Sequence, residues 1–324
     1  MTPRQHTTRH STVVDADVES VYRLIEDVSV WAAIFGPTVY VHPMARNGNR
    51  ERLRIWASLN GKVTCWTSVR TLDRENRCIS FEREHPKAPL ARMGGHWEFR
   101  AASRGGTEIV LHHHFSTVND SPESVDRVSR AQEENSTAEL AALGKVTDKG
   151  HPVRDILFTF HHKTTASGSV ADAYDFVHRA EHWPARLPHV AHVRLTEEGP
   201  RVQNLEMVTR APGGQTQTTD SVRVCFANEM IAYKQRALPV PLIGHGGRWK
   251  FGQAGNNIVI ESEHTVLLDP SQVRDVLGAS ATVGDARVFV RDAIERNSRL
   301  TLLHAKEFAE RARTAPVPGY SAWA

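Results

Sequence analysis

The strand-like run Lys62–Arg70 carries the polar side chains that are most informative about chemistry. Alternation along a strand puts Trp66, Ser68 and Arg70 on one face. If that face lines a cavity, it presents an aromatic wall, a hydroxyl and a permanent cation with several donors in a planar fork. Burying such a cation unpaired is costly, so its burial would imply either a carboxylate partner or an anionic ligand. The pattern leaves open which face of the strand is concave.

The same residue types return later in the chain. Ser221 and Arg223 repeat Ser68 and Arg70 at an offset of 153 residues, although Thr219 occupies the position that matches the tryptophan. Further matches follow in the same order along both halves. A period of this length is too long for a solenoid unit, so it predicts two copies of one complete domain.

A pair of glycines precedes a tryptophan in each half. Gly94-Gly-His-Trp-Glu-Phe99 shares four of six residues with Gly246-Gly-Arg-Trp-Lys-Phe251. Two glycines in a strand indicate a bend or a close backbone approach. Trp97 and Trp249 would then wall a cavity, with ordinary core packing as the alternative.

Two other residue types recur at matching positions. Trp31 and Trp183 follow the first helical segment of each half, and Asn135 and Asn297 lie within the closing helices. Asparagine is a weak helix former. Its return is compatible with hydrogen bonding into the cavity, with exposure to solvent as the alternative.

The run His112–His114 resembles a metal-binding cluster at first sight. On a strand, however, His113 points away from its two neighbours. No cysteine or acidic residue close in sequence completes a zinc-like spacing, and Glu261 and Glu263 occupy the matching place in the second half. We therefore expect no metal site. The sequence also contains no GxSxG motif, no Cys/His nucleophile pattern and no phosphate-binding loop.

Hydrophobic periodicity outlines the scaffold that must position these side chains. Each half predicts a strand, short helices, a six-strand antiparallel meander and one long closing helix. We expect Asp15 to cap the first helix, Asn60-Gly61 to form a hairpin turn, and the closing helices to span Pro122–Gly144 and Ala286–Arg313. The strands expected in the first half are His6–Val14, Val39–Ala45, Leu53–Leu59, Val63–Thr71, Cys78–Arg83, His96–Ala101 and Ile109–Val118.

The predicted fold class is α+β, with two tandem domains that each curve an antiparallel sheet around a long C-terminal helix. Such a layered arrangement leaves an internal cavity between sheet and helix. Strands and helices do not alternate and no GxGxxG motif follows a strand, which excludes a Rossmann fold. The domains are expected at residues 1–147 and 153–313, separated by a Gly- and Pro-containing boundary, with a flexible tail at 314–324.

Composition fits a cytoplasmic globular protein. The chain has 324 residues, a formal net charge of +3 and three cysteines without disulfide or metal spacing. The charge is too small and too evenly spread for a nucleic-acid-binding surface. No apolar run approaches the length of a membrane span, and the N-terminus lacks the apolar region of a secretory signal.

These motifs together resemble the aromatase/cyclases of bacterial type II polyketide synthases, which are START-like helix-grip proteins. The duplication resembles their didomain subclass. The resemblance implies an enzyme that takes a poly-β-ketone from an acyl carrier protein, closes its first ring by aldol condensation and dehydrates it. It further implies a ketoreduced chain, closure between carbons 7 and 12, other synthase components as partners, and no cofactor.

The resemblance also implies site residues. One pocket arginine corresponds to Arg70, and a second corresponds to Arg83 or, less closely, to Arg236 in the second copy. The pocket tryptophan corresponds to Trp97 and the helix asparagine to Asn135 or Asn297. A tyrosine that single-domain relatives carry is absent, since Thr38 stands near its place.

We hypothesise that Arg70 is the main electrostatic group of the first pocket and Arg223 that of the second. Ser68, His96 or an arginine-bound water would relay protons during dehydration. Because the second copy lacks the tryptophan of Lys62–Arg70, the first pocket is the better equipped. The alternative from another class is a non-catalytic carrier of a hydrophobic small molecule.

Overall fold

The computed structural model describes residues 4–147, 150–210 and 214–314. Contacts divide the chain into two compact units, Met1–Phe158 with Val266–Gln272 and Thr159–Thr265 with Val273–Ala324. The domain bounds expected from the sequence stay a prediction. Residues 148 and 149 of the expected boundary, and 315–324 of the expected tail, lie outside the described residues.

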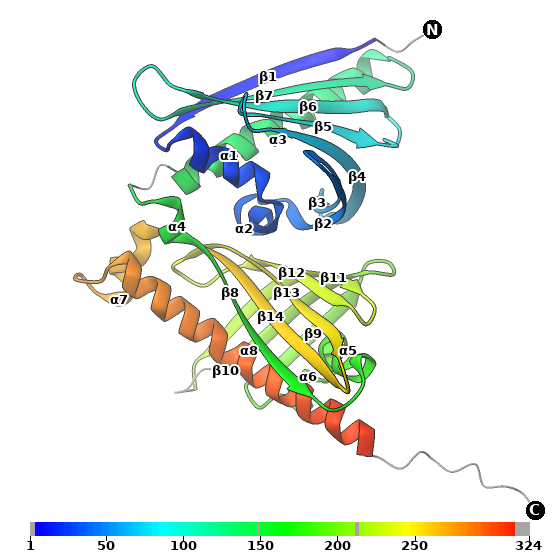
Figure 1. Cartoon of the computed structure of the whole chain (residues 1–324), viewed down its shortest axis with the longest axis vertical. Helices are drawn as coiled ribbons and strands as arrows, with labels where there is room; N and C mark the ends of the chain where they lie inside the picture. The colour runs from blue at the N-terminus through cyan, green and yellow to red at the C-terminus, as the bar shows by residue number, and fades with distance from the viewer. Residues whose placement is uncertain (1–3, 148–149, 211–213, 315–324) are drawn as a thin grey trace, which may run out of the picture. The chain divides into compact units, whose positions relative to one another are not determined.

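The first unit contains a seven-stranded sheet in the order β1-β7-β6-β5-β4-β3-β2 (Figure 1). This order is the predicted meander of six strands with the N-terminal strand added beside the last one. The elements are β1 (His6–Val14), α1 (Val18–Glu26), η1 (Val28–Val30), α2 (Trp31–Ile34), β2 (Thr38–Asn47), β3 (Arg50–Leu59), β4 (Lys62–Asp73), β5 (Cys78–Glu84), β6 (Leu90–Ala101), β7 (Thr107–Thr117) and α3 (Pro122–Thr147).

Local residues explain where these elements begin and turn. Asp17, and not the predicted Asp15, caps α1, because its side chain accepts a hydrogen bond from the backbone N–H of Ser20 at 2.9 Å. Asn60 and Gly61 both adopt positive φ values, 51° and 76°, as the predicted tight hairpin between β3 and β4 requires.

The second unit repeats the order, with a seven-stranded sheet β8-β14-β13-β12-β11-β10-β9. Its elements are β8 (Leu157–Ala166), α5 (Val170–His178), η2 (Ala180–His182), α6 (Trp183–Arg186), β9 (Val190–Glu197), β10 (Val202–Arg210), β11 (Thr216–Phe226), β12 (Met230–Ala237), β13 (Leu242–Ala254), β14 (Asn257–Leu268), α7 (Val273–Leu277) and α8 (Val283–Thr314). Two short elements, α4 (Val153–Ile156) and η3 (Pro270–Gln272), fall within the first unit.

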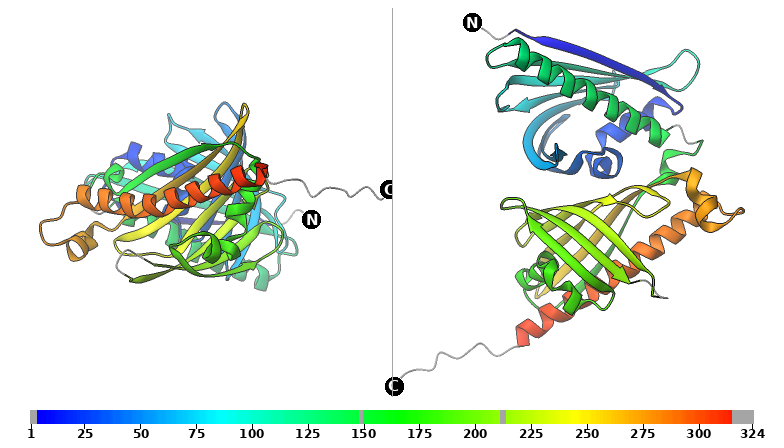
Figure 2. Two further views of the ribbon diagram at one scale, coloured as in Figure 1. Left: turned by 90° about the horizontal axis from the view of Figure 1, so that it is seen from below. Right: turned by 180° about the vertical axis from the view of Figure 1, so that it is seen from behind.

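A long helix lies across the curved sheet of each unit (Figure 2). In the first unit, α3 buries Val128, Leu140, Leu143 and Val146. Burial of such apolar side chains stabilises the helix on the sheet. In the second unit, α8 buries Leu302, Ala305 and other small or apolar residues, and Phe308 packs at the edge of the same core. The α+β class and the two tandem copies are confirmed.

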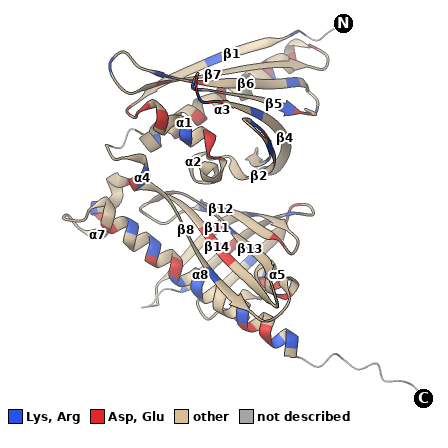
Figure 3. Cartoon of the chain, in the orientation of Figure 1, with Lys and Arg blue, Asp and Glu red and all other residues tan. Residues whose placement is uncertain are grey.

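Lys, Arg, Asp and Glu are interspersed over both units (Figure 3). Along α8 many of these charges are neutralised by ion pairs between residues four apart, such as Arg299 with Glu295 at 3.1 Å. Among the described residues, no helix combines the length and the hydropathy that crossing a bilayer requires.

Candidate active site

A row of paired residues crosses the first sheet at its centre. From β3 to β7 the register aligns Glu51, Arg70, Phe81, Gly95 and His113. Paired residues of antiparallel strands project from the same face. Arg70, Phe81 and His113 line a cavity, so this face of the sheet is the concave one.

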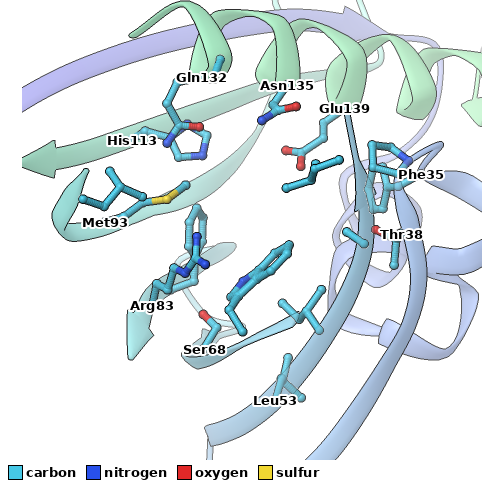
Figure 4. A pocket seen from close by; sticks show the side chains of 18 of the residues that line it. Phe35, Thr38, Leu53, Ser68, Arg83, Met93, His113, Gln132, Asn135 and Glu139 are labelled. Carbon is cyan, nitrogen blue, oxygen red and sulfur yellow. The ribbon is translucent and has the colours of Figure 1, made fainter. Parts of the chain in front are cut away.

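The first cavity has a volume of about 410 Å³ and lies between the sheet and α3 (Figure 4). Its walls are mainly apolar and aromatic. The structure brings seven of the residues predicted from the sequence to this cavity: Trp31, Trp66, Ser68, Arg70, Arg83, Trp97 and Asn135.

Arg70 is 4% exposed and fully engaged by the protein. Its guanidinium pairs with Glu51 at 2.7 Å, and its Nη1 and Nη2 donate to the backbone carbonyls of Ile25 and Glu26 at the end of α1. Burial lowers the pKa of Arg70, and Glu51 opposes that shift. Of the two alternatives left open by the sequence, the structure gives this arginine the carboxylate partner. Arg70 therefore closes the C-terminus of α1.

Arg83 is the contrasting cation of the same cavity. Its Cζ lies 5.0 Å from the ring centroid of Trp66, in a cation–π contact. Its buried Nε has no hydrogen-bond partner within the described part of the chain. Burial lowers the pKa of this guanidinium, which nevertheless stays charged. Arg83, more than Arg70, can therefore donate hydrogen bonds to an oxygen atom inside the cavity.

Glu139 projects from α3 into the cavity, across from the sheet that carries Arg83 (Figure 4). Burial among apolar side chains raises the pKa of this carboxyl group to about 7. A carboxyl group with such a pKa can both take and give a proton near neutral pH. The sequence analysis missed it, although it stands four residues after Asn135 and thus on the same helix face.

His113 completes the polar part of the first cavity. Its side chain is 6% exposed, and burial lowers its pKa to about 4, so the imidazole is neutral at pH 7. Its Nδ1 lies 3.3 Å from Oγ of Ser136 on α3. The ring meets Phe81 edge-on at 5.6 Å.

The second sheet repeats the row with different chemistry. Gln203, Arg223, Tyr233 and Gly247 align from β10 to β13. Arg223 and Tyr233 of this row line a second, smaller cavity of about 200 Å³ between the sheet and α8. The structure places five further predicted residues around this cavity: Trp183, Ser221, Arg223, Trp249 and Asn297.

Arg223 is 3% exposed and lacks the carboxylate that neutralises Arg70. Its Nη2 donates to the carbonyl of Val177 at 2.6 Å, and more weakly to that of His178, at the end of α5. Its Nη1 has no partner, and no carboxylate lies within ion-pair distance among the described residues. Burial lowers its pKa. The second cavity therefore borders on a buried positive charge that no anion compensates.

Three residues that the sequence analysis did not select form a hydrogen-bonded cluster in the second cavity. Oη of Tyr233 lies 2.6 Å from Nδ1 of His264 and 3.4 Å from Nε2 of His245. Nδ1 of His245 lies 2.6 Å from Oε1 of Gln235. Burial lowers the pKa of His245 to about 4 and that of His264 well below its ordinary value.

Six of the predicted residues form parts of the cavity walls and are held there by the protein. Trp31 and Trp183 donate their indole N–H groups to the carbonyls of Leu24 and Phe176, at 3.1 and 2.9 Å. The hydroxyls of Ser68 and Ser221 donate to backbone carbonyls of neighbouring strands. Trp97 and Trp249 are buried in the wall.

Comparison with known proteins identifies the family of the chain. The family model "Polyketide cyclase / dehydrase and lipid transport" matches residues 14–130 and again 167–301. The granaticin polyketide synthase bifunctional cyclase/dehydratase of Streptomyces violaceoruber is 44% identical over 96% of each chain. The chain belongs to this polyketide cyclase/dehydrase family. It is an aromatase/cyclase, and the two family matches confirm the duplication inferred from the sequence.

Other relatives support the same family for this aromatase/cyclase. The actinorhodin polyketide synthase bifunctional cyclase/dehydratase of Streptomyces coelicolor is 41% identical over 94% of this chain and 96% of that one. The crystal structure of the di-domain ARO/CYC BexL from the BE-7585A pathway superposes with a TM-score of 0.85 and 42% identity, covering 94% and 99% of the two chains. The crystal structure of the di-domain ARO/CYC StfQ from the steffimycin pathway superposes with a TM-score of 0.78 and 30% identity, covering 95% of this chain and 100% of that one.

Two predicted site residues of the aromatase/cyclase lie outside the cavities. His96 does not line the first cavity; it stacks on His112 at 4.4 Å and pairs with Glu98, because it alternates with the inward Trp97 along β6. Arg236 is exposed and pairs with Asp220 at 2.6 Å.

The strand register explains why Arg236 lies outside. Ser221 pairs with Gln235, in continuous register with Arg223 and Tyr233, as Ser68 pairs with Arg83; the register shift between Ser221 and Asp220 comes next and leaves Arg236 without a paired residue. The counterpart of Arg83 is therefore Gln235, one residue before Arg236, and Gln235 lines the second cavity.

On the outer face of the first sheet, the fold gathers His96, Glu98 and His112, whose ligand atoms lie within 4.8 Å of one another. His96 and Glu98 lie on β6 and His112 lies on β7, so spacing along one strand could not predict this cluster. Glu98 is also paired with Arg100. The expectation of no metal stays a prediction.

Proposed function

We propose that this aromatase/cyclase closes the first ring, between carbons 7 and 12, of a ketoreduced poly-β-ketone carried by an acyl carrier protein, and then dehydrates that ring. The names of its relatives, bifunctional cyclase/dehydratases of polyketide synthases, support the two reactions. The resemblance to didomain aromatase/cyclases supports the ketoreduced substrate, the closure position, and the acyl carrier protein and other synthase components as partners.

The observation that carries this proposal is the first cavity, where an arginine whose buried Nε finds no acceptor among the described residues and a carboxyl group with a pKa of about 7 share an apolar enclosure. Aldol closure needs a base to form an enolate and a cation to polarise the carbonyl that the enolate attacks. Glu139 supplies the first and Arg83 the second.

The steps balance with these two side chains. The Glu139 carboxylate removes a proton from a carbon between two carbonyl groups, which leaves an enolate. The enolate carbon forms a bond with the carbon of a different carbonyl group, farther along the chain, and the electron pair of that C=O bond moves to its oxygen. Arg83 stabilises the alkoxide, which then takes the proton back from Glu139 to become a hydroxyl group.

The aromatic walls contribute orientation. Trp31, Trp66 and Trp97 restrict the folding of a flexible chain, which holds the two reacting carbons near each other and supplies much of the advantage of an intramolecular reaction. In this account Arg70 and Ser68 hold the wall in place instead of touching the reacting atoms, which revises the sequence-based assignment.

Product analysis tests the proposal. A minimal polyketide synthase with its ketoreductase is assayed with and without the full chain. We expect a new product whose first ring is closed and aromatic. Arg83→Gln, which installs the residue of the second copy, should return the profile to the shunt products. An unchanged profile in the presence of the folded wild-type protein would contradict the proposal and favour a ligand carrier.

A further inference from the structure

The second cavity contains chemistry that the first cavity lacks at matching positions. Tyr233 and His245 replace Phe81 and Met93 of the first sheet, as the strand register and the repeated glycine motif align them. The substitutions convert an apolar pair into a phenol and an imidazole that lie 3.4 Å apart.

The glycine of the repeated motif makes this cluster sterically possible. A Cβ atom on Gly247 would lie 2.5 Å from Oη and 2.8 Å from Cζ of Tyr233, so only glycine lets the ring lie across β13. In the first sheet, Gly95 makes the same room for Phe81, whose Cζ would lie 2.9 Å from such a Cβ. The ring position is thus shared by the two copies, and the hydroxyl is what the second copy adds.

The hydrogen bonds of the cluster favour one direction of donation. Oε1 of Gln235 only accepts, so Nδ1 of His245 carries a proton and its Nε2 presents a lone pair. Tyr233 then donates its O–H to that Nε2 and accepts from Nδ1–H of His264. These tautomers, assigned from the network, leave no N–H or O–H of the cluster without an acceptor. They connect the cavity-facing phenol to a neutral buried base.

The charge beside this cluster is unbalanced. Arg223 is the strand-pairing neighbour of Tyr233 across β11 and β12, and both side chains line the cavity. Within the described part of the chain Arg223 has no carboxylate partner, and Gln203 stands where Glu51 neutralises Arg70. A buried cation without a counter-ion stabilises negative charge that develops next to it. Enolates and phenolates are such charges.

We propose that Tyr233 is the catalytic residue of the dehydration step, with His245 as its proton relay and Arg223 as the stabilising cation. This inference rests on the proposed function and assigns part of it to the second cavity. The substrate of this cavity is the ring-closed β-hydroxy ketone that aldol closure produces.

The step balances. The Tyr233 oxygen takes the α-proton as its own proton moves to Nε2 of His245, and the C–H electron pair becomes the enolate. The enolate expels the β-hydroxyl group, so the C–O bond breaks and a C=C bond forms. The departing oxygen takes the proton that His245 returns through Tyr233 and leaves as water. The protein ends unchanged, and no oxidant or reductant is needed.

The test uses Tyr233→Phe and His245→Met, the residues that the same fold carries in its first copy. The full chain is assayed in the reconstituted synthase, where we expect each variant to lower the ratio of dehydrated to hydroxylated ring-closed product by about 100-fold or more. His192→Met is the matched control. It makes the same change at an exposed histidine of β9, outside the residues that line the cavity, and should keep the wild-type ratio.

The double variant separates a relay from a structural role for His245. If both residues act as one unit, Tyr233→Phe with His245→Met is no slower than Tyr233→Phe alone. If His245 had only a structural role, the double variant would dehydrate the ring more slowly than Tyr233→Phe.

A small probe separates the failure of this inference from failure of the proposed function. The β-hydroxy ketone 4-hydroxy-4-phenylbutan-2-one becomes a conjugated, ultraviolet-absorbing enone on dehydration. Acceleration by the wild-type chain that is lost in Tyr233→Phe supports the relay even if no aromatic polyketide forms. Equal dehydration by wild type and Tyr233→Phe, in the probe assay and in the synthase, would overturn the relay and leave ring closure standing.

Discussion

The two cavities share a scaffold but differ in their reactive groups. In both, a buried arginine holds the end of the first helix and a tryptophan donates to a carbonyl of that helix. The first cavity then adds Arg83 and Glu139, whose counterparts in the second are Gln235 and Thr301. The second cavity instead adds the Tyr233 cluster and leaves its buried arginine without a carboxylate.

The proposed division of two reactions follows from this difference. Positions that hold helix to sheet have the same residue types in both copies, whereas positions that face the cavity differ in linked sets. An arginine with its carboxylate accompanies a phenylalanine, and an arginine without one accompanies a tyrosine. The sequence favours the first pocket only because Thr219 replaces Trp66 in the second copy. That comparison leaves out the cluster of Tyr233, His245 and His264, which the second cavity gains.

The largest effect is expected from removing the carboxyl group of the first cavity. Glu139→Gln keeps the shape of the side chain but cannot take a proton, so ring closure should slow by about 100-fold or more. Rates of first-ring formation in the reconstituted synthase measure this, with the exposed Glu134→Gln on the same helix as the control. Unchanged ring closure would show that the base lies elsewhere.

A difference in stability is expected between the two buried arginines. Arg70→Ala leaves two helix carbonyls unpaired and leaves the largely buried Glu51 with the exposed Arg46 as its partner, so the first domain should lose about 3 kcal/mol or more of unfolding free energy. Arg223→Ala leaves only backbone carbonyls at the end of α5 without their hydrogen-bond donor, so a loss of about 1–3 kcal/mol of unfolding free energy is expected for the second domain. Urea unfolding of the full-length variants measures both. Equal losses would contradict the difference in charge compensation.

Acid should destabilise the second domain more than the first. The pKa of His113 and that of His245 are lowered to about 4 in the folded chain, from 6.5, so the unfolded chain binds the extra proton. The stabilisation by each neutral imidazole is fully present above pH 6.5 and is lost as pH falls toward 4, by about 3 kcal/mol per histidine. In the second domain His264 shifts in the same direction, whereas in the first domain the raised pKa of Glu139 opposes the loss, because the folded chain keeps that proton at a higher pH than the unfolded chain.

Unfolding curves recorded between pH 7 and pH 4 check this dependence. His245→Met should flatten the curve of the second domain and leave that of the first unchanged. A pH dependence that the variant does not alter would contradict the burial of a neutral imidazole at this position.

The most local effect is expected at the glycines beneath the aromatic rings. A Cβ atom at Gly95 or Gly247 would lie 2.1 or 2.2 Å from a backbone carbonyl oxygen of the neighbouring strand and within 3 Å of the ring of Phe81 or Tyr233. Each alanine variant must therefore shift both strand and ring, and should lose at least about 1–3 kcal/mol of stability. Only Gly247→Ala should also separate Tyr233 from His264 and so impair dehydration. Thermal unfolding and the product ratio measure the two consequences. Equal loss of dehydration in both variants would contradict the assignment.

The sequence predicted the scaffold well, because periodicity, turn residues and the internal repeat all depend on local or repeated patterns. It placed most cavity residues correctly, since alternation on β4 fixes which side chains share a face. It could not show that Arg70 is neutralised by Glu51, because that contact joins two strands. It also could not show that the strand register places Gln235, and not Arg236, in the second cavity. The cluster of Tyr233, His245 and His264 was out of reach as well, because its members come from three strands.

The measurement that tests the division of chemistry most directly compares Glu139→Gln with Tyr233→Phe in the reconstituted synthase. The account predicts that the first variant yields uncyclised shunt products, and that the second yields a closed ring that keeps its hydroxyl group. Identical product profiles from the two variants would contradict it and show that one cavity performs both reactions.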